Sequence, residues 1–103
     1  LRRTLAERKQ QAWQSLLRHM PAGVKIHHND SGYFLWLELP AQLDAGLLSE
    51  KALTHHISIA PGKMFSTSDA WTPFFRFNTS WAWGEREEQA VIQLGKLIST
   101  MLE

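Results

Sequence analysis

The chain of 103 residues contains no cysteine, which excludes disulfides and thiolate metal ligands. It also lacks any apolar run near the roughly 20 residues that a membrane-spanning helix requires. Eleven basic and ten acidic side chains leave a formal net charge of only +1, so no general field attracts nucleic acid or an anionic membrane. We therefore expect one cytoplasmic domain, residues 1–103, with no membrane partner.

Several catalytic and ligand-binding patterns are missing as well. The segment Pro61-Gly62-Lys63 is too short for a phosphate-binding loop. The pairs His27-His28 and His55-His56 are adjacent residues, whose side chains point to opposite faces of a strand, so neither pair chelates a metal by itself. Glu38 and Asp69 are the only carboxylates expected near the later strands, which disfavours a two-carboxylate hydrolase. We expect no metal site and no catalytic residue in this chain.

What the chain does contain is a regular succession of helix and strand patterns. Apolar residues at helical spacing predict helices over residues 1–20, about 45–55 and 84–102. Short apolar or alternating runs predict strands over residues 24–27, 33–39, 57–60 and 74–78. The connections are short, which favours an antiparallel sheet. The order α-β-β-α-β-β-α therefore predicts an α+β, two-layer fold with the helices on one face of a mainly antiparallel small sheet.

The strand predicted over Tyr33 to Leu39 is apolar on both of its faces, which is typical of a central strand. If the helices cover the face that bears Leu35 and Leu37, then Phe34 and Trp36 lie on an open sheet face. Such an aromatic patch usually marks an interface. The polar and aromatic segment of residues 63–73 is long for a connection, and long loops often carry function.

Arg76 is the most informative residue, because it lies in the aromatic strand Phe74–Asn78. Alternation along a strand places Phe75 and Phe77 on one face and Arg76 on the other. A guanidinium among aromatic rings either reaches water along its own apolar stem or finds an anion, since an unpaired buried charge is very costly. Its planar fork suits a carboxylate or a phosphate. The local pattern leaves both interpretations open.

Three ordered segments resemble one family. They are Ser31-Gly32-Tyr33-Phe34-Leu35-Trp36-Leu37-Glu38-Leu39-Pro40, Ile59-Ala60-Pro61-Gly62-Lys63-Met64-Phe65-Ser66 and Phe75-Arg76-Phe77-Asn78. Together they are similar to the C-terminal small domain of fold-type I aminotransferases, which depend on pyridoxal 5'-phosphate (PLP). The second and third segments, followed by Trp81, more narrowly resemble the MocR subfamily of GntR transcriptional regulators, in which a DNA-binding domain precedes the aminotransferase-like domain.

The resemblance implies that Arg76 binds the carboxylate of an amino-acid substrate or effector, or of its adduct with PLP. It also implies that Phe34 lines the pocket. The other pocket-lining candidates are Tyr33, Lys63, Phe65 and Asn78. The chain begins without Met, inside a helix pattern, and we interpret it as a fragment of a longer protein.

The large PLP-binding domain of that protein, with its Schiff-base lysine, is not part of this sequence, so we expect the fragment alone to bind no PLP. The resemblance implies a homodimer that contacts DNA through the absent N-terminal domain. Two alternatives remain open: the small domain of a genuine aminotransferase with turnover, and a stand-alone interaction module that uses the face of Phe34 and Trp36.

Overall fold

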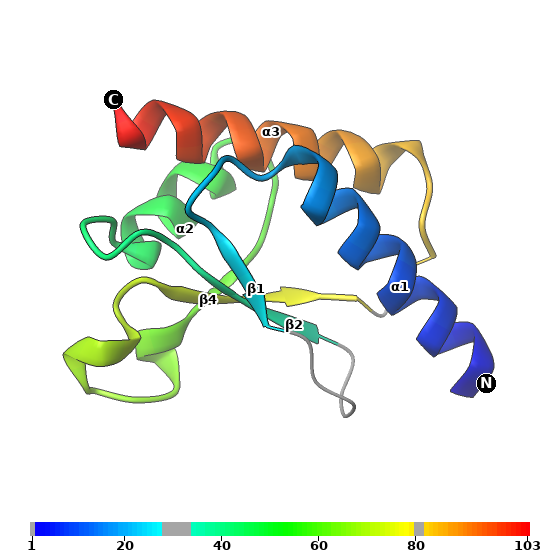
Figure 1. Cartoon of the computed structure of the whole chain (residues 1–103), viewed down its shortest axis with the longest axis horizontal. Coiled ribbons are helices and arrows are strands. Elements are labelled where there is room, and N and C mark those ends of the chain that lie inside the picture. Colours follow the sequence, from blue (N-terminus) through cyan, green and yellow to red (C-terminus); the bar gives the residue numbers. More distant parts are fainter. Residues whose placement is uncertain (1, 28–33, 80–81) are drawn as a thin grey trace.

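A computed structural model describes residues 2–27, 34–79 and 82–103 of the chain (Figure 1). Within these residues the elements follow the predicted order, with two additional 3-10 turns between the third and fourth strands. Their bounds are α1 Arg2–His19, β1 Lys25–His27, β2 Phe34–Glu38, α2 Ala45–Leu53, β3 Ala60–Pro61, η1 Gly62–Met64, η2 Asp69–Trp71, β4 Phe74–Asn78 and α3 Glu85–Leu102. The predicted α+β fold is confirmed.

The described strands form one antiparallel sheet in the order β1-β2-β4-β3. Figure 1 shows α2 and α3 above the sheet and α1 running down beside it, while the segment that carries η1 and η2 lies below the sheet. The long pairing is between β2 and β4, which face each other from Phe34↔Asn78 to Glu38↔Phe74. The two aromatic strands are therefore neighbours, as the central position predicted for β2 requires.

The hydrophobic core lies between the sheet and the helices. Leu35, Leu37 and Phe75 are fully buried there, and Phe77 is nearly so, because alternate residues of β2 and β4 point to the same side. Helix α3 contributes its predicted apolar stripe, of which Val91, Leu94 and Ile98 are fully buried. The Cα radius of gyration is 13.0 Å, the value of a compact domain of about 100 residues.

The third strand differs from its prediction. Ile57 and Ile59 are buried, as a strand would have them, but pairing with β4 begins only at Ala60↔Arg76 and continues to Pro61↔Phe75. The segment before Ala60 follows a turn at residues 54–56, so its isoleucines fill the core without joining the hydrogen-bond ladder. An apolar alternating run indicates that its apolar residues are buried, but buried residues need not belong to a strand.

Helix α2 ends slightly earlier than predicted, and some apolar residues of the helices are exposed. Helix α2 begins as predicted, because the Asp44 carboxylate accepts the Gly46 amide at 2.7 Å, but it ends at Leu53 instead of His55. Leu17 and Leu47 are exposed, with 60% and 47% of their surface accessible. Each helix carries more apolar residues than its contact face accommodates. No helix in the described ranges has the length and apolar character needed to cross a membrane.

Helices α1 and α3 approach each other closely where the first of them ends. Gly95 of α3 is buried against this end, and a Cβ at that position would meet the carbonyl oxygen of His19. A glycine in a helix interior costs about 1 kcal/mol relative to alanine. Close approach of the two backbones is the physical reason for a glycine here.

Candidate functional site

Arg76 lies at the centre of the sheet, on the face turned away from the helices. Its strand β4 has Trp36 of β2 opposite Arg76 on one side and Ala60 of β3 opposite it on the other. Phe75 and Phe77 are buried in the core, whereas Arg76 is half-buried. The alternation predicted for this strand is confirmed, and it directs the one charged side chain of β4 away from the core.

Two aromatic rings enclose the guanidinium of Arg76. Its Cζ atom lies 4.5 Å from the centroid of the Phe34 ring and 4.4 Å from that of the Phe65 ring. Cation–π contacts of this kind each contribute about 0.5–2 kcal/mol, depending on desolvation. The rings come from β2 and from the residue after η1, so two segments distant in sequence hold one side chain. Rings over a guanidinium leave its N–H groups, which point outward in its plane, for a ligand.

No carboxylate in the described part of the chain pairs with Arg76. The two acidic residues expected nearby have other partners: Glu38 accepts a hydrogen bond from His27 Nε2 at 3.0 Å, and Asp69 accepts one from Lys63 Nζ at 3.0 Å. Arg76 is therefore positioned by aromatic contacts that leave its positive charge uncompensated. This arrangement suits a receptor for an external anion.

A continuous set of rings surrounds this side chain. Trp36 lies 5.6 Å from Phe65 and 5.3 Å from Trp71, and Trp71 lies 4.9 Å from Phe74, measured between ring centroids. We call Phe34 and these four rings the aromatic face. The segment of residues 62–73 thus folds back over the sheet, so the expectation of a wholly open sheet face at Phe34 and Trp36 was wrong. The fold of this loop, and not the pattern of the strand, determines how much of this sheet face is exposed.

The loop closes through one glycine and one ion pair. A Cβ at Gly62 would lie 2.7 Å from the Trp71 carbonyl oxygen, so the two 3-10 turns approach each other closely only because this residue has no side chain. The ion pair between Lys63 and Asp69 joins the same two turns. Because Lys63 is directed to Asp69, it is not brought to the Arg76 guanidinium.

The remaining predicted pocket residues divide as follows. Phe34 and Phe65 contact Arg76, as described above. Asn78 is exposed two residues further along β4, on the same strand face as Arg76. Tyr33 lies outside the described residues, as does Trp81 of the resemblance.

Trp71 and Phe74 were not predicted as part of the site. A tryptophan in an otherwise polar loop was nevertheless a usable signal, because its large apolar ring gains most when another surface covers it. The structure brings this ring to Trp36 and Phe74, at the edge of the aromatic face.

A second polar cluster was not anticipated from the sequence. The carboxylate of Glu88, in the first turns of α3, accepts hydrogen bonds from Ser15 Oγ at 2.7 Å, His19 Nε2 at 2.8 Å, Arg18 Nη2 at 3.1 Å and Trp83 Nε1 at 3.2 Å. The Ser15 hydrogen bond, followed by that of His19, lowers the pKa of Glu88 from 4.5 to about 2. Helices α1 and α3 are thereby joined through one carboxylate.

Comparison with known proteins shows what the sequence and the fold of this chain are similar to. No family model matches the chain. It is 78% identical over 102 residues to the uncharacterized HTH-type transcriptional regulator YdcR of Escherichia coli (strain K12), a match that covers 99% of this chain and 22% of that protein. It is 28% identical over 102 residues to the 2-aminoadipate transaminase of Thermus thermophilus, covering 99% of this chain and 26% of the enzyme.

The fold has a solved counterpart. The crystal structure of LysN, the α-aminoadipate aminotransferase of Thermus thermophilus, in complex with N-(5'-phosphopyridoxyl)-L-leucine, matches with a TM-score of 0.87 and 28% identity. The match covers 98% of this chain and 26% of LysN, so the chain spans about a quarter of the length of the proteins it resembles. The chain has the fold of the C-terminal small domain of fold-type I aminotransferases, and its sequence is similar to that of HTH-type, MocR-like transcriptional regulators.

Proposed function

We propose that this chain is the C-terminal part of a longer, PLP-dependent, aminotransferase-like transcriptional regulator, in which Arg76 binds the carboxylate of an amino acid. The observation that carries the proposal is the guanidinium held between Phe34 and Phe65 with no carboxylate of the described chain beside it. In this proposal the full protein is a homodimer that contacts DNA through an upstream domain, as the likeness to an HTH-type regulator suggests.

The arrangement of Arg76 fits a planar carboxylate for two reasons. Its fork can donate two parallel hydrogen bonds to the two carboxylate oxygens. The two rings within 4.5 Å of the guanidinium limit the access of water to it, which strengthens an ion pair relative to one in bulk solvent. Bidentate binding fixes the orientation of the amino acid as well as its distance, and orientation is what a neighbouring reactive group requires.

PLP, when bound, would supply an aldehyde for the amino group and an electron sink, and this chain would supply the contact to the other end of the amino acid. The ligand present in the LysN structure joins a phosphopyridoxyl group to leucine, so in that protein cofactor and amino acid occupy one site. Arg76, with its open in-plane donors, fits the carboxylate of such a ligand. Carboxylate binding at this domain would couple amino-acid binding to the arrangement of the rest of the protein.

The alternative, a genuine aminotransferase with turnover, uses the same site. The similarity to the regulator YdcR is much higher than that to the 2-aminoadipate transaminase, 78% against 28% identity, and this difference favours the regulator. The two proposals are distinguished in the full protein. A helix-turn-helix domain and ligand-dependent DNA binding support the regulator, whereas turnover without DNA binding supports the aminotransferase.

The test is the substitution Arg76→Lys in the full-length protein. Lysine keeps the charge but loses the planar fork. We expect the affinity of the PLP form for its amino acid to fall by about 1–3 kcal/mol, as expected for loss of a charge-assisted hydrogen bond. The affinity is measured through the change in cofactor absorbance on titration with each of the standard amino acids.

Arg18→Lys serves as the matched control, because Arg18 lies on α1, away from the aromatic face. It should leave the amino-acid affinity unchanged. An equal affinity of Arg76→Lys and the unsubstituted protein would contradict the carboxylate role and favour the interaction-module alternative.

The chain of residues 1–103 alone is expected to fold without cofactor and to acquire no visible absorption band after incubation with PLP. Its own core is extensive, and the one lysine of the neighbouring loop, Lys63, is paired with Asp69. Far-UV circular dichroism checks the first expectation and an absorption spectrum after gel filtration checks the second. A stable yellow complex would show that the chain holds PLP by itself.

A further inference from the structure

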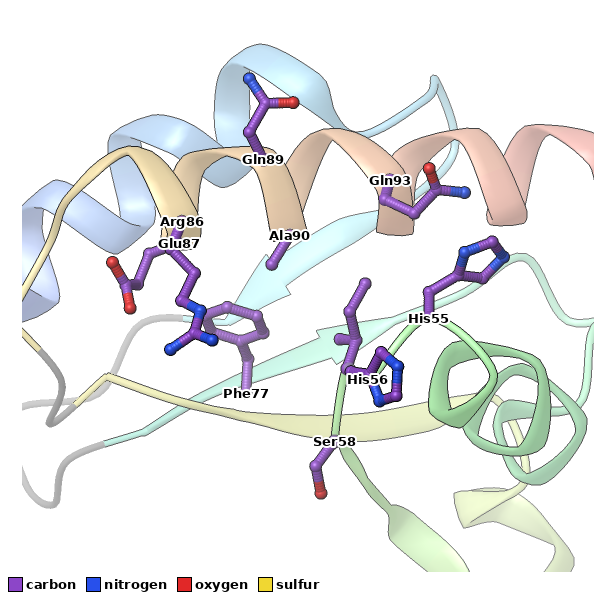
Figure 2. Close-up of a pocket in the computed structure, with 10 residues that line it drawn as sticks. His55, His56, Ser58, Phe77, Arg86, Glu87, Gln89, Ala90 and Gln93 are labelled. Carbon is purple, nitrogen blue, oxygen red and sulfur yellow. The ribbon is translucent and has the colours of Figure 1, made fainter.

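Phe65 is the most exposed of the five phenylalanines of the chain. About half of its surface, 49%, is accessible to solvent. Phe77, in contrast, is only 4% exposed and lies on the side of β4 that α3 covers (Figure 2). The hydrophobic effect scales with the apolar area removed from water. Burial therefore accounts for the position of Phe77, whereas it accounts for at most part of that of Phe65.

The contacts of the Phe65 ring lead to Arg76. The centroid of the ring lies 4.4 Å from Cζ of Arg76. Trp36 packs against the same ring, with the centroids 5.6 Å apart and an interplanar angle of 83°, which is the edge-to-face arrangement that aromatic pairs favour. Trp36 is also the residue opposite Arg76 in the pairing of β2 with β4. The ring thus contacts both the guanidinium and the residue that faces it across the sheet.

The backbone around η1 fixes where this ring lies. Phe65 follows η1, and its amide donates to the Gly62 carbonyl at 2.9 Å. The absence of a Cβ at Gly62 lets η1 lie against the carbonyl oxygen of Trp71 in η2. Directly before η1, Ala60 of β3 pairs with Arg76 itself. The segment that carries Phe65 is therefore attached to the strand that carries Arg76, so backbone contacts hold the ring beside the guanidinium.

A ring held beside a guanidinium affects how tightly that guanidinium binds an anion. Arginine loses much rotamer freedom when a ligand fixes its side chain. If the side chain is already held in the free protein, part of this loss no longer opposes binding, and the affinity rises. The cation–π contact uses the face of the guanidinium, whereas a carboxylate accepts hydrogen bonds from its in-plane N–H groups. The ring and the carboxylate therefore do not compete for the same part of Arg76.

We propose that Phe65 is a positioning residue, which orients the fork of Arg76 for a carboxylate before the ligand binds. The inference rests on the carboxylate role proposed for Arg76, and it adds the residue that sets the geometry of that contact. Trp36 supports the ring, and the turn at Gly62 presents it. The effect of Phe65 on the carboxylate passes through the guanidinium, so a ligand without a carboxylate is unaffected by it.

The test compares two ligands on the full-length protein freed of its cofactor. One is N-(5'-phosphopyridoxyl)-L-leucine, the ligand of the LysN structure, and the other is N-(5'-phosphopyridoxyl)-3-methylbutylamine, the same molecule without its carboxylate. Isothermal titration calorimetry gives both affinities, and their ratio isolates the contribution of the carboxylate. We expect Phe65→Leu to lower this ratio about fivefold, the effect of losing one cation–π contact at a partly exposed site, and to leave the affinity for the amine unchanged.

Three further variants separate positioning from a general role of the loop. Phe65→Tyr keeps an aromatic ring and should retain the ratio. Met64→Leu is the matched control, because it changes a neighbouring side chain of the same turn that is 70% exposed, and it should leave the ratio unchanged. In a protein that also carries Arg76→Gln, Phe65→Leu should change the ratio by less than about twofold, since no cation remains for the ring to hold.

The outcomes distinguish this proposal from the proposed function. If Arg76→Lys lowers the ratio and Phe65→Leu does not, the positioning role is overturned and the carboxylate role of Arg76 stands. An equal loss of affinity for both ligands in Phe65→Leu would likewise overturn the positioning role, since the amine has no carboxylate to orient. Equal affinities of the two ligands for the unsubstituted protein, or no binding of either, would contradict the proposed function and this inference with it.

Discussion

Glu88→Ala is expected to lower the free energy of unfolding of this chain by about 3 kcal/mol, the effect of removing an acceptor shared by several donors. The carboxylate joins Ser15, Arg18 and His19 of α1 to Trp83, which precedes α3. Ser15 is fully buried, so its hydroxyl would lose its partner without gaining water. A loss of this size corresponds to a fall in melting temperature of roughly 12–24 °C for a domain of this length.

Glu88 is also expected to make the stability of the folded chain depend on pH. The folded-state pKa of Glu88, about 2, is below its usual value of 4.5. A depressed pKa contributes stability that is fully present above the unfolded-state value and is lost as the pH falls through the folded-state value. We expect the melting temperature of the unsubstituted chain to fall between pH 4.5 and pH 2, and that of Glu88→Gln to fall less over this window.

Glu85→Ala is the matched control, because Glu85 is an exposed carboxylate in the first turn of the same helix. Its effect should be limited to about 0.3–1 kcal/mol from the helix dipole. Thermal unfolding followed by circular dichroism at several pH values measures all three variants. Equal losses for Glu85→Ala and Glu88→Ala would mean that the hydrogen bonds of Glu88 add nothing to the dipole effect.

Gly95→Ala is the second large expected effect, and here two physical effects oppose each other. Alanine in an unhindered helix interior would stabilise the chain by about 1 kcal/mol. At this position, however, the new methyl group meets the His19 backbone carbonyl, which cannot rotate away as a flexible side chain would. Overpacking of this kind costs about 1–3 kcal/mol and sometimes more, so we expect packing to prevail, with a net loss of about 2 kcal/mol.

The control for this substitution is Ser99→Ala, at an exposed position of the same helix. At this position the substitution changes only the helix propensity of the residue, so the free energy of unfolding should be unchanged or rise by a few tenths of a kcal/mol. Urea-induced unfolding of the two variants and the unsubstituted chain gives the comparison at constant temperature. A stabilised Gly95→Ala chain would show that α1 and α3 can separate at little cost, and the close approach would then have no structural importance.

Local sequence patterns predicted the secondary structure well where one physical requirement dominated. Strand β4 was predicted at Phe74–Asn78 and lies there, because the alternation of Phe75 and Phe77 with Arg76 and Asn78 has one solution on a half-buried strand. Helix α3 was predicted with its buried stripe because apolar residues recur along it at helical spacing. The third strand was misplaced, since Ile57 and Ile59 are buried without strand pairing, and an apolar run does not distinguish these two outcomes.

The site shows a similar division. Its polar centre could be found from sequence, because an arginine within an aromatic strand is unusual, and the resemblance to aminotransferases supplied the role that we propose for it. Phe34 and Phe65 were predicted to line the pocket. Phe34 lies on strand β2, on the face that alternation predicts. The position of the Phe65 ring, 4.4 Å from the Arg76 guanidinium, depends on a loop that folds back over the sheet, which no local pattern encodes.

By itself the sequence determined the order of helices and strands, the core face of each long strand and the direction of Arg76, because periodicity acts over a few residues. Only the tertiary structure decided that the loop covers the aromatic face and that Glu88 joins two helices about 70 residues apart. These features arise from contacts between distant segments, whose approach depends on the packing of the whole domain.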